Sequence, residues 1–318
     1  MRKGTEQTLP SGRTAVKKRN TWQKMKRDWR LYVLLAIPMI LLIVFSYLPM
    51  VGILMAFQDF NFRQGYLGSP WVGFKYFEMF LKSPMFGTLM KNTIILSLYG
   101  MVAGFFVPII LAITVNEINN KFFKKSVQMI TYAPFFISTV VLVGMLFQLF
   151  APRTGLINNI IAALGGQENN FMGDSSYFRH IYVWSGVWQG SGYGAIIYIA
   201  ALAGVNPELY QAAAIDGATK FQKLRYIDIP GIAPTIIINL ILSVGGILGV
   251  GFEKTYLMQN NLNLNVSEVI STYVYKVGLQ QMQYGFSAAV GLFNSVVSFI
   301  LLVIVNAVAN KVSETSLW

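Results

Sequence analysis

The side chains that could do chemistry in this chain are concentrated in one apolar stretch near its middle. Between residues 181 and 205, tryptophan, tyrosine and glutamine alternate with glycines, and no charged residue is present. Polar groups at membrane depth are costly unless they face a partner or a water-filled cavity. Aromatic planes beside amide groups suit the alternating CH faces and hydroxyls of a sugar. A sugar-binding surface and a glycine-mediated helix-packing surface are therefore both open interpretations.

Under the first interpretation, six residues are predicted to line a path for such a ligand. They are Trp184, Trp188, Gln189, Tyr193, Tyr256 and Asn294. Asn294 lies near the middle of another apolar stretch, where a polar residue is expected to face the interior of a helix bundle. Glu253 is expected either to pair with its neighbour Lys254, which is the preferred interpretation, or to face a vestibule.

The residue types needed for catalysis or metal binding are missing. The sequence has no cysteine, which excludes disulfides, zinc-thiolate sites and thiol nucleophiles. It contains no phosphate-binding loop, no His-Glu-x-x-His, no Gly-x-Ser-x-Gly and no calcium loop. The single histidine, His180, is interpreted as an interfacial residue. We therefore expect no enzyme activity, no metal and no cofactor in this chain.

The composition places these residues in a membrane. Hydrophobic residues make up 54% of the chain and charged residues 12%, whereas a soluble domain would have roughly a quarter charged. About 20 apolar residues are needed for a helix to cross the hydrocarbon core. The predicted fold is an all-α membrane protein with a 31–310 transmembrane domain. Its six transmembrane helices are expected at about residues 31–58, 92–116, 126–152, 181–205, 233–252 and 286–310.

The distribution of Lys and Arg predicts the orientation of the spans. Residues 1–30 carry ten of the 25, and such clusters favour the cytoplasmic side. We expect residues 1–30 to form a cytoplasmic basic tail with an interfacial helix, and residues 311–318 a cytoplasmic C-terminal tail. Residues 206–231 then lie in the cytoplasm between the fourth and fifth spans. Anionic lipid, rather than nucleic acid, is the expected partner of this positive charge.

Residues 206–231 form the one long polar segment that interrupts the apolar chain. An Asn-Pro pair can begin a short helix there, and Gly217 can end it. Thr219 and Gln222 have the spacing of a capping box for a second helix, which Pro230 is expected to close. Three consecutive alanines in the first helix would let another protein approach the backbone closely. The segment is therefore predicted to be a docking element.

At residues 211–230 the sequence resembles a cytoplasmic loop of permease subunits from binding-protein-dependent ABC importers. The family pattern is Glu-Ala-Ala, three residues, Gly, nine residues, then Ile-x-Leu-Pro. The spacing is kept here, with Gln211 in place of Glu and Ile229 in place of Leu. The resemblance assigns coupling to an ATPase to Gln211, Ala212, Ala213, Asp216, Gly217, Ile227 and Pro230.

Other segments are similar to the branch of this family that handles oligosaccharides and polysaccharide fragments. They are Arg27–Tyr32, Trp71–Phe74, Gly251–Glu253, Ile270–Tyr275 and Glu314–Trp318. The resemblance implies a type I ABC importer permease in the bacterial cell (plasma) membrane that works by alternating access. It implies a heterodimer with a second homologous permease, and an extracytoplasmic sugar-binding protein. Two ABC ATPase subunits would bind ATP and Mg, so this chain would need no cofactor.

Two rival functions remain. A secondary, ion-coupled sugar carrier would need ionisable residues within its spans, and the six apolar windows contain none. A membrane assembly protein without transport activity would have no ATPase partner. ATP-driven import of an oligosaccharide or polysaccharide fragment is the preferred interpretation, and the sugar and its charge stay open.

Overall fold

The computed structural model describes residues 26–246 and 248–313. The regular secondary structure of this described part is helical, apart from one isolated β-bridge between Gln58 and Trp71, which confirms the all-α prediction. The predicted tails lie largely outside it, up to residue 25 and from residue 314. The chain divides into two compact units, residues 1–52 and 53–318, which are described separately.

The described part of the first unit, from residue 26, is a single apolar helical segment. Helix α2 (Trp29–Leu42) continues through a π-helical turn, η1 (Ile43–Tyr47), into the 3-10 helix η2 (Leu48–Phe57), which crosses into the second unit. The apolar side chains of α2 are exposed on all sides. A helix that is hydrophobic all round is typical of a membrane span.

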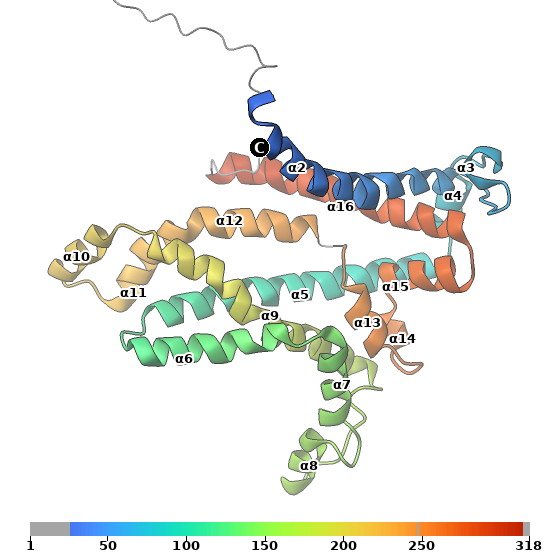
Figure 1. The fold of residues 1–318 in the computed structure, drawn as a ribbon. Helices are drawn as coiled ribbons and strands as arrows, with labels where there is room; N and C mark the ends of the chain where they lie inside the picture. The colour runs from blue at the N-terminus through green and yellow to red at the C-terminus, as the bar shows by residue number, and fades with distance from the viewer. Residues whose placement is uncertain (1–25, 247, 314–318) are drawn as a thin grey trace, which may run out of the picture. The chain divides into compact units, whose positions relative to one another are not determined.

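The second unit is built around two long helices, α5 (Met85–Asn116) and α9 (Ser175–Ala203), which run side by side (Figure 1). Ala112 of α5 and Ala195 of α9 are fully buried in one apolar cluster. Small side chains let helix backbones approach closely. In lipid, where the hydrophobic effect does not drive helices together, the van der Waals contacts of such close packing hold them. Helix α12 (Ile229–Gly245) packs against α9 and against α16 (Tyr284–Ser313).

The third apolar stretch is bent rather than straight. Helix α6 (Lys121–Tyr132) leads through the short 3-10 helix η3 (Ala133–Phe136) to α7 (Thr139–Leu149), and the two long parts are bent by 99°. Pro134 lies in η3, just before the break, and Ser138 caps α7 by accepting a hydrogen bond from the Val141 N–H. The sequence predicts one span at 126–152, whereas the chain turns sharply within it.

The remaining helices are short and connect the long ones. They are α3 (Gly65–Gly68), α4 (Lys75–Leu81), α8 (Leu156–Ala163), α10 (Pro207–Ile215), α11 (Lys220–Lys223), the π-helical turn η4 (Leu224–Asp228), α13 (Phe252–Met258), α14 (Leu264–Ser267), α15 (Ile270–Tyr275) and the π-helical turn η5 (Lys276–Gln280).

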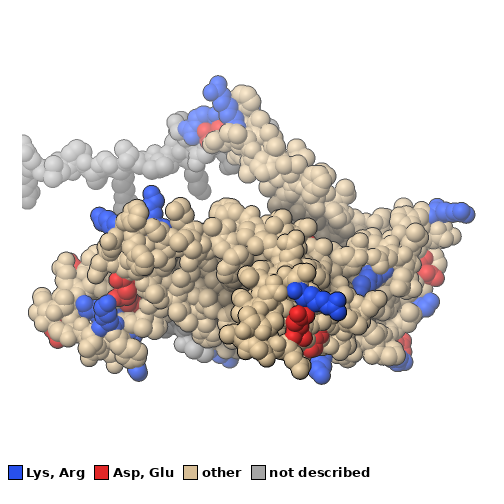
Figure 2. Space-filling view, turned by 90° about the horizontal axis from the view of Figure 1, so that it is seen from below, with Lys and Arg blue, Asp and Glu red and all other residues tan. Residues whose placement is uncertain are grey.

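Four helical stretches in the described residues are long and apolar enough to cross a membrane. They are Trp29–Phe57, Met85–Asn116, Lys220–Gly245 and Tyr284–Lys311, and the bent α6–α7 pair makes a fifth if it is one span. Helix α9 has 29 residues, enough to cross, but its polar residues and glycines keep it outside this group. In Figure 2, charged side chains gather toward the end that carries α10 and α11 and toward the opposite end, with a largely uncharged surface between.

Candidate functional site

The polar segment 206–231 folds as the pair of short helices that its caps predict. The Asn206 side chain accepts a hydrogen bond from the Glu208 N–H at 3.0 Å and so begins α10. At the other end, Gly217 has φ +68°, and the Ala218 N–H reaches back to the Ala213 carbonyl at 2.8 Å. A residue in the left-handed conformation, followed by a hydrogen bond from the next N–H to the carbonyl five residues earlier, forms the Schellman motif. This motif provides hydrogen-bond donors for the last carbonyls of a helix.

The second helix of the segment does not end at Pro230 as expected. Thr219 and Gln222 form the predicted capping box for α11. From there the chain is helical without a break through η4 and α12 to Gly245. A proline ring normally clashes with the carbonyl four residues earlier. Pro230 is the second residue after a wider π-helical turn, in which backbone hydrogen bonds span five residues instead of four. The end of the polar segment 206–231 is thus continuous with α12, the helix that follows it.

The segment presents large apolar side chains to its surroundings. Ile215 is 87% exposed, and Phe221 and Tyr226 are also largely exposed. Around them, Gln211, Ala212, Asp216, Gly217 and Pro230 are exposed, whereas Ala213 and Ile227 are half-buried. Exposed apolar residues grouped in this way are typical of protein-interaction surfaces, and the docking role of the segment stays a prediction.

One tyrosine that the sequence interpretation missed holds this segment in place. The Tyr210 hydroxyl donates to the carboxylate of Asp228 at 2.6 Å, and Asp228 is buried. Burial and the neighbouring carboxylate raise the pKa of Tyr210, so that its hydroxyl stays protonated and able to donate. The bond joins α10 to the π-helical turn before α12. The two residues are 18 positions apart, and no local pattern indicates that they meet.

Replacing Tyr210 with Phe is expected to loosen α10. The change leaves the buried Asp228 carboxylate without this donor, which costs roughly 1–3 kcal/mol. Hydrogen exchange of the α10 amides should become roughly tenfold faster or more, because local opening follows local stability. Tyr226→Phe is the matched control, since that side chain is largely exposed. Equal exchange in the two variants would contradict the anchoring role.

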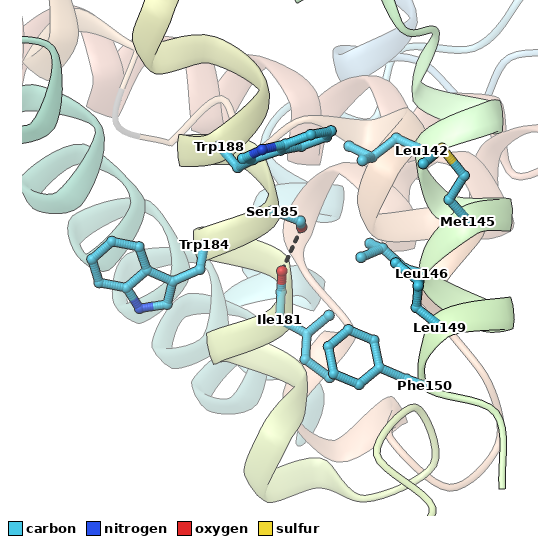
Figure 3. A pocket seen from close by; sticks show the side chains of 9 residues that line it. All are labelled: Leu142, Met145, Leu146, Leu149, Phe150, Ile181, Trp184, Ser185 and Trp188. Atoms are coloured by element: carbon cyan, nitrogen blue, oxygen red, sulfur yellow. Dashed lines mark hydrogen bonds between the residues drawn. The ribbon is translucent and has the colours of Figure 1, made fainter. Parts of the chain in front are cut away.

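The six predicted path residues do not gather in one cavity. Trp184 and Trp188 of α9 line an apolar cavity of about 300 Å³, together with side chains of α7. Figure 3 shows Trp188 reaching toward Leu142, whereas the Trp184 ring points away from α7. The Trp184 indole N–H donates to the Tyr99 hydroxyl at 2.8 Å. That hydroxyl also contacts His180 at 3.0 Å, which gives the single histidine a partner.

Two other path residues brace the bend in the third apolar stretch. The Gln189 side chain donates to the Ile137 carbonyl, which the break leaves free, at 2.7 Å. Tyr193 stacks on Phe135 with ring centroids 3.9 Å apart. Gly192 lies against the backbone of the same bend. Glycine-mediated packing thus accounts for part of α9, and Gln189 also borders a second cavity.

The last two path residues lie on other elements. The Tyr256 hydroxyl accepts from Gln280 at 3.1 Å, and its ring packs against Tyr275. The Asn294 side-chain amide donates to the Leu248 carbonyl at 3.4 Å. Its buried carbonyl oxygen has no partner among the described residues. A transport role for all six residues stays a prediction.

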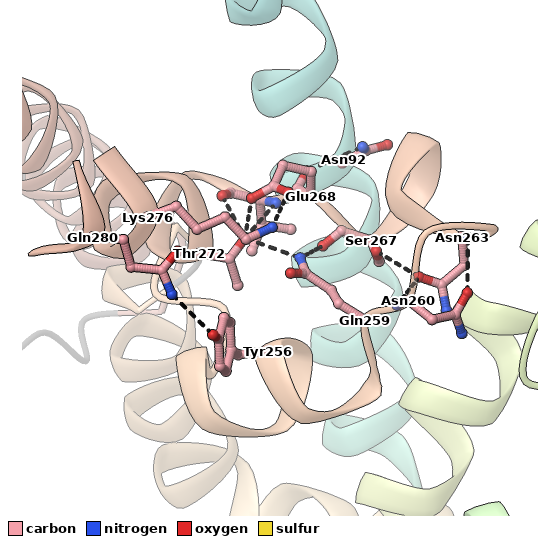
Figure 4. A network of polar contacts seen from close by, with 11 residues as sticks. Asn92, Tyr256, Gln259, Asn260, Asn263, Ser267, Glu268, Thr272, Lys276 and Gln280 are labelled. Atoms are coloured by element: carbon pink, nitrogen blue, oxygen red, sulfur yellow. Dashed lines mark hydrogen bonds and ion pairs between the residues drawn. The ribbon is translucent and has the colours of Figure 1, made fainter. Parts of the chain in front are cut away.

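A buried polar network, which the sequence interpretation also missed, ties α13, α14 and α15 together (Figure 4). The buried Glu268 carboxylate accepts from Thr272 and pairs with Lys276. The Asn92 side chain donates to the Glu268 backbone carbonyl at 3.1 Å, which fixes this network to α5. The network thus links three short helices to α5, although the buried side-chain oxygen of Gln259 has no partner among the described residues.

Comparisons with known proteins point in one direction. Residues 104–314, more than half of the chain, match the family described as "Binding-protein-dependent transport system inner membrane component". Protein LplB of Bacillus subtilis (strain 168) is 41% identical over 294 residues, which are 92% of each chain. The polygalacturonan/rhamnogalacturonan transport system permease protein YteP of the same organism is 40% identical over 295 residues, 93% of this chain and 92% of that protein.

A solved structure gives the same result for the fold. The chain is similar to one in the crystal structure of a bacterial ABC transporter involved in the import of the acidic polysaccharide alginate, with a TM-score of 0.86. The two are 37% identical, and the match covers 92% of this chain and 99% of that one.

Proposed function

The chain belongs to the family of binding-protein-dependent transport system inner membrane components, and from this we propose that it is the permease of an ATP-driven sugar importer. Its substrate is an oligosaccharide or polysaccharide fragment, the class named for two of its relatives. The observation that carries the proposal is the exposed, capped helix pair α10–α11, which bears the motif residues and runs on into α12.

The coupling between the ATPase contact and the membrane helices follows from the unbroken helix that joins α11 to α12. A partner that moves α11 also moves α12, because Lys220–Gly245 is one helical stretch. Helix α12 in turn packs against α9 and α16, so the displacement reaches the helices around the path. In this mechanism Gln211 through Asp216 form the contact surface, Gly217 sets the turn, and Ile227 and Pro230 join the surface to α12. Gln211 contributes hydrogen bonds in place of the salt bridge that a Glu would form.

The proposed topology has six spans with both termini in the cytoplasm. Four spans are the long apolar helices, the fifth is the bent α6–α7 pair, and the sixth is α9. Polar and glycine-rich α9 is stable at membrane depth because it packs along α5 and bonds to neighbouring elements through Trp184 and Gln189.

The proposed complex contains four further subunits. A second homologous permease forms a heterodimer with this chain, and two ABC ATPase subunits bind ATP and Mg. An extracytoplasmic sugar-binding protein delivers the substrate. This chain supplies no catalytic group and no cofactor site; it binds and guides the sugar and converts movement of α10–α11 into alternating access.

Reconstitution tests the proposal. The permease pair, ATPase and binding protein are placed in proteoliposomes, and uptake of radiolabelled oligosaccharides is measured. Uptake is expected only with internal ATP and the binding protein. Uptake that survives ATP removal but collapses with the ion gradient would instead support a secondary carrier. Failure of any ATPase to co-purify with the extracted chain would support an assembly protein.

A further inference from the structure

A second cavity, distinct from the apolar one that Trp188 lines, lies between α5 and α9. Its volume is about 360 Å³, within the range of small-ligand sites. Five glycines contribute to its wall, and Gln189 and Lys254 bring polar side chains to it. The glycines are Gly100, Gly104, Gly186, Gly190 and Gly194. Because these residues lack side chains, a ligand can approach the helix backbones.

Lys254 of α13 is the charged residue in this wall. Its ammonium donates to the Tyr182 carbonyl at 2.8 Å and lies 4.8 Å from the centre of the Tyr182 ring. Gly186 provides the room, because a Cβ atom there would lie 3.1 Å from the Lys254 nitrogen. The ammonium is thus held in a fixed place at the edge of the cavity.

The ammonium has no carboxylate partner among the ion pairs of the described residues. The expected pair with Glu253 is not formed, and Glu253 is exposed while Lys254 is half-buried. A lysine ammonium has three donors, and the hydrogen bond to Tyr182 uses one. A cation withdrawn from water is costly unless an anion compensates it. The cavity therefore favours a negatively charged occupant.

The polar surface extends beyond this cavity. A neighbouring cavity of about 240 Å³ shares Gly100 and Tyr182 with it. Ser97 lines that neighbour, and its buried hydroxyl oxygen has no hydrogen-bond partner among the described residues. Buried hydroxyls normally have a partner. A ligand rich in hydroxyl groups would provide one beside the cation.

The geometry points to Lys254 as the residue that binds a carboxylate group of an acidic sugar, which makes the imported glycan a uronic acid oligosaccharide. This inference rests on the proposed function and adds the charge of the substrate, which that proposal leaves open. The bond is charge-assisted, and such bonds are about twice as strong as neutral ones. Gln189 and the glycine backbones would meet the uncharged part of the sugar.

Direct binding to the importer without its binding protein tests the inference, because the specificity of the binding protein then plays no part. Radiolabelled trigalacturonate and its fully methyl-esterified form differ in charge but share length and ring hydroxyls. Equilibrium dialysis is run in phosphatidylcholine nanodiscs, which lack anionic lipid. The wild-type importer is expected to bind the acid at least roughly tenfold more tightly than the ester, and Lys254→Gln should remove this difference. Lys254→Arg should retain it.

Lys75→Gln is the matched control. Lys75 also lies beside a tyrosine ring, 5.7 Å from the Tyr76 centroid, but it is exposed on α4 and outside the cavity. Equal binding of acid and ester by the wild type, or no binding of the acid, would overturn the inference. Equal weakening of both ligands by Lys254→Gln would also overturn it, because the lysine would then only position α13. ATP-dependent uptake of a neutral oligosaccharide would leave the proposed function standing.

Discussion

Gly217→Val is expected to reduce sugar uptake strongly while the ATPase subunits remain active. Gly217 has φ +68° at the end of α10, and a β-branched residue in that region costs roughly 1–3 kcal/mol. The turn then favours another conformation, in which the hydrogen bond from the Ala218 N–H to the Ala213 carbonyl is lost. Because α10 and α11 form the proposed ATPase contact, its geometry changes and ATP hydrolysis no longer moves α12.

The measurement compares uptake and ATP hydrolysis in the same proteoliposomes. At least a roughly tenfold fall in uptake per ATP hydrolysed is expected, because a strain of this size disfavours the native turn about tenfold or more. Gly217→Asn is the control, since Asn tolerates the left-handed region. No atom lies within 4 Å of the position of an added Cβ, so the backbone angle, and not a clash, distinguishes the two variants. Normal uptake by Gly217→Val would refute the coupling role.

Gly192→Ala is expected to prevent correct packing of α9 against α6. An added Cβ would lie 1.9 Å from the Thr131 carbonyl oxygen and 2.4 Å from its carbon. These are backbone atoms, which cannot turn away as the end of a side chain can. Overpacking typically costs 1–3 kcal/mol and sometimes more, so the yield of folded protein and its melting temperature should both fall.

Gly190→Ala provides a matched control on the same helix, because an added Cβ there would have no atom within 4 Å. Both changes raise helix propensity by about 1 kcal/mol, so their difference isolates the clash. The readouts are gel filtration and thermal unfolding of the detergent-extracted protein. If the two variants elute at the same volume and unfold at the same temperature, the close approach of α9 and α6 does not require a glycine at residue 192.

The helix pair α10–α11 shows why some features could be predicted. Its caps at Asn206 and Thr219 and its turn at Gly217 act over two to five residues. Interactions of such short range are contained in the local sequence. Pro230 was the exception, because the π-helical turn that accommodates it has no signal that sequence periodicity detects.

The bend between α6 and α7 shows why other features could not be predicted. The third apolar stretch is long enough for a straight span, and its break is stabilised by Gln189, 52 residues away. The same holds for Lys254, whose acceptor on Tyr182 is 72 residues away. The sequence predicts a pair between Lys254 and the adjacent Glu253, because it shows which residues are neighbours in the chain but not which distant residues meet.

By itself, the sequence therefore determined that the chain is an all-helical membrane protein with a capped polar segment inside it. Hydrophobicity and capping are properties of single residues and short windows, so no partner element is needed to recognise them. Only the tertiary structure decided that Tyr210 meets Asp228, that Gln189 braces a bend and that Lys254 borders a cavity. Those contacts depend on how closely α9 approaches its neighbours, which is set when whole helices pack and their glycines let the backbones meet.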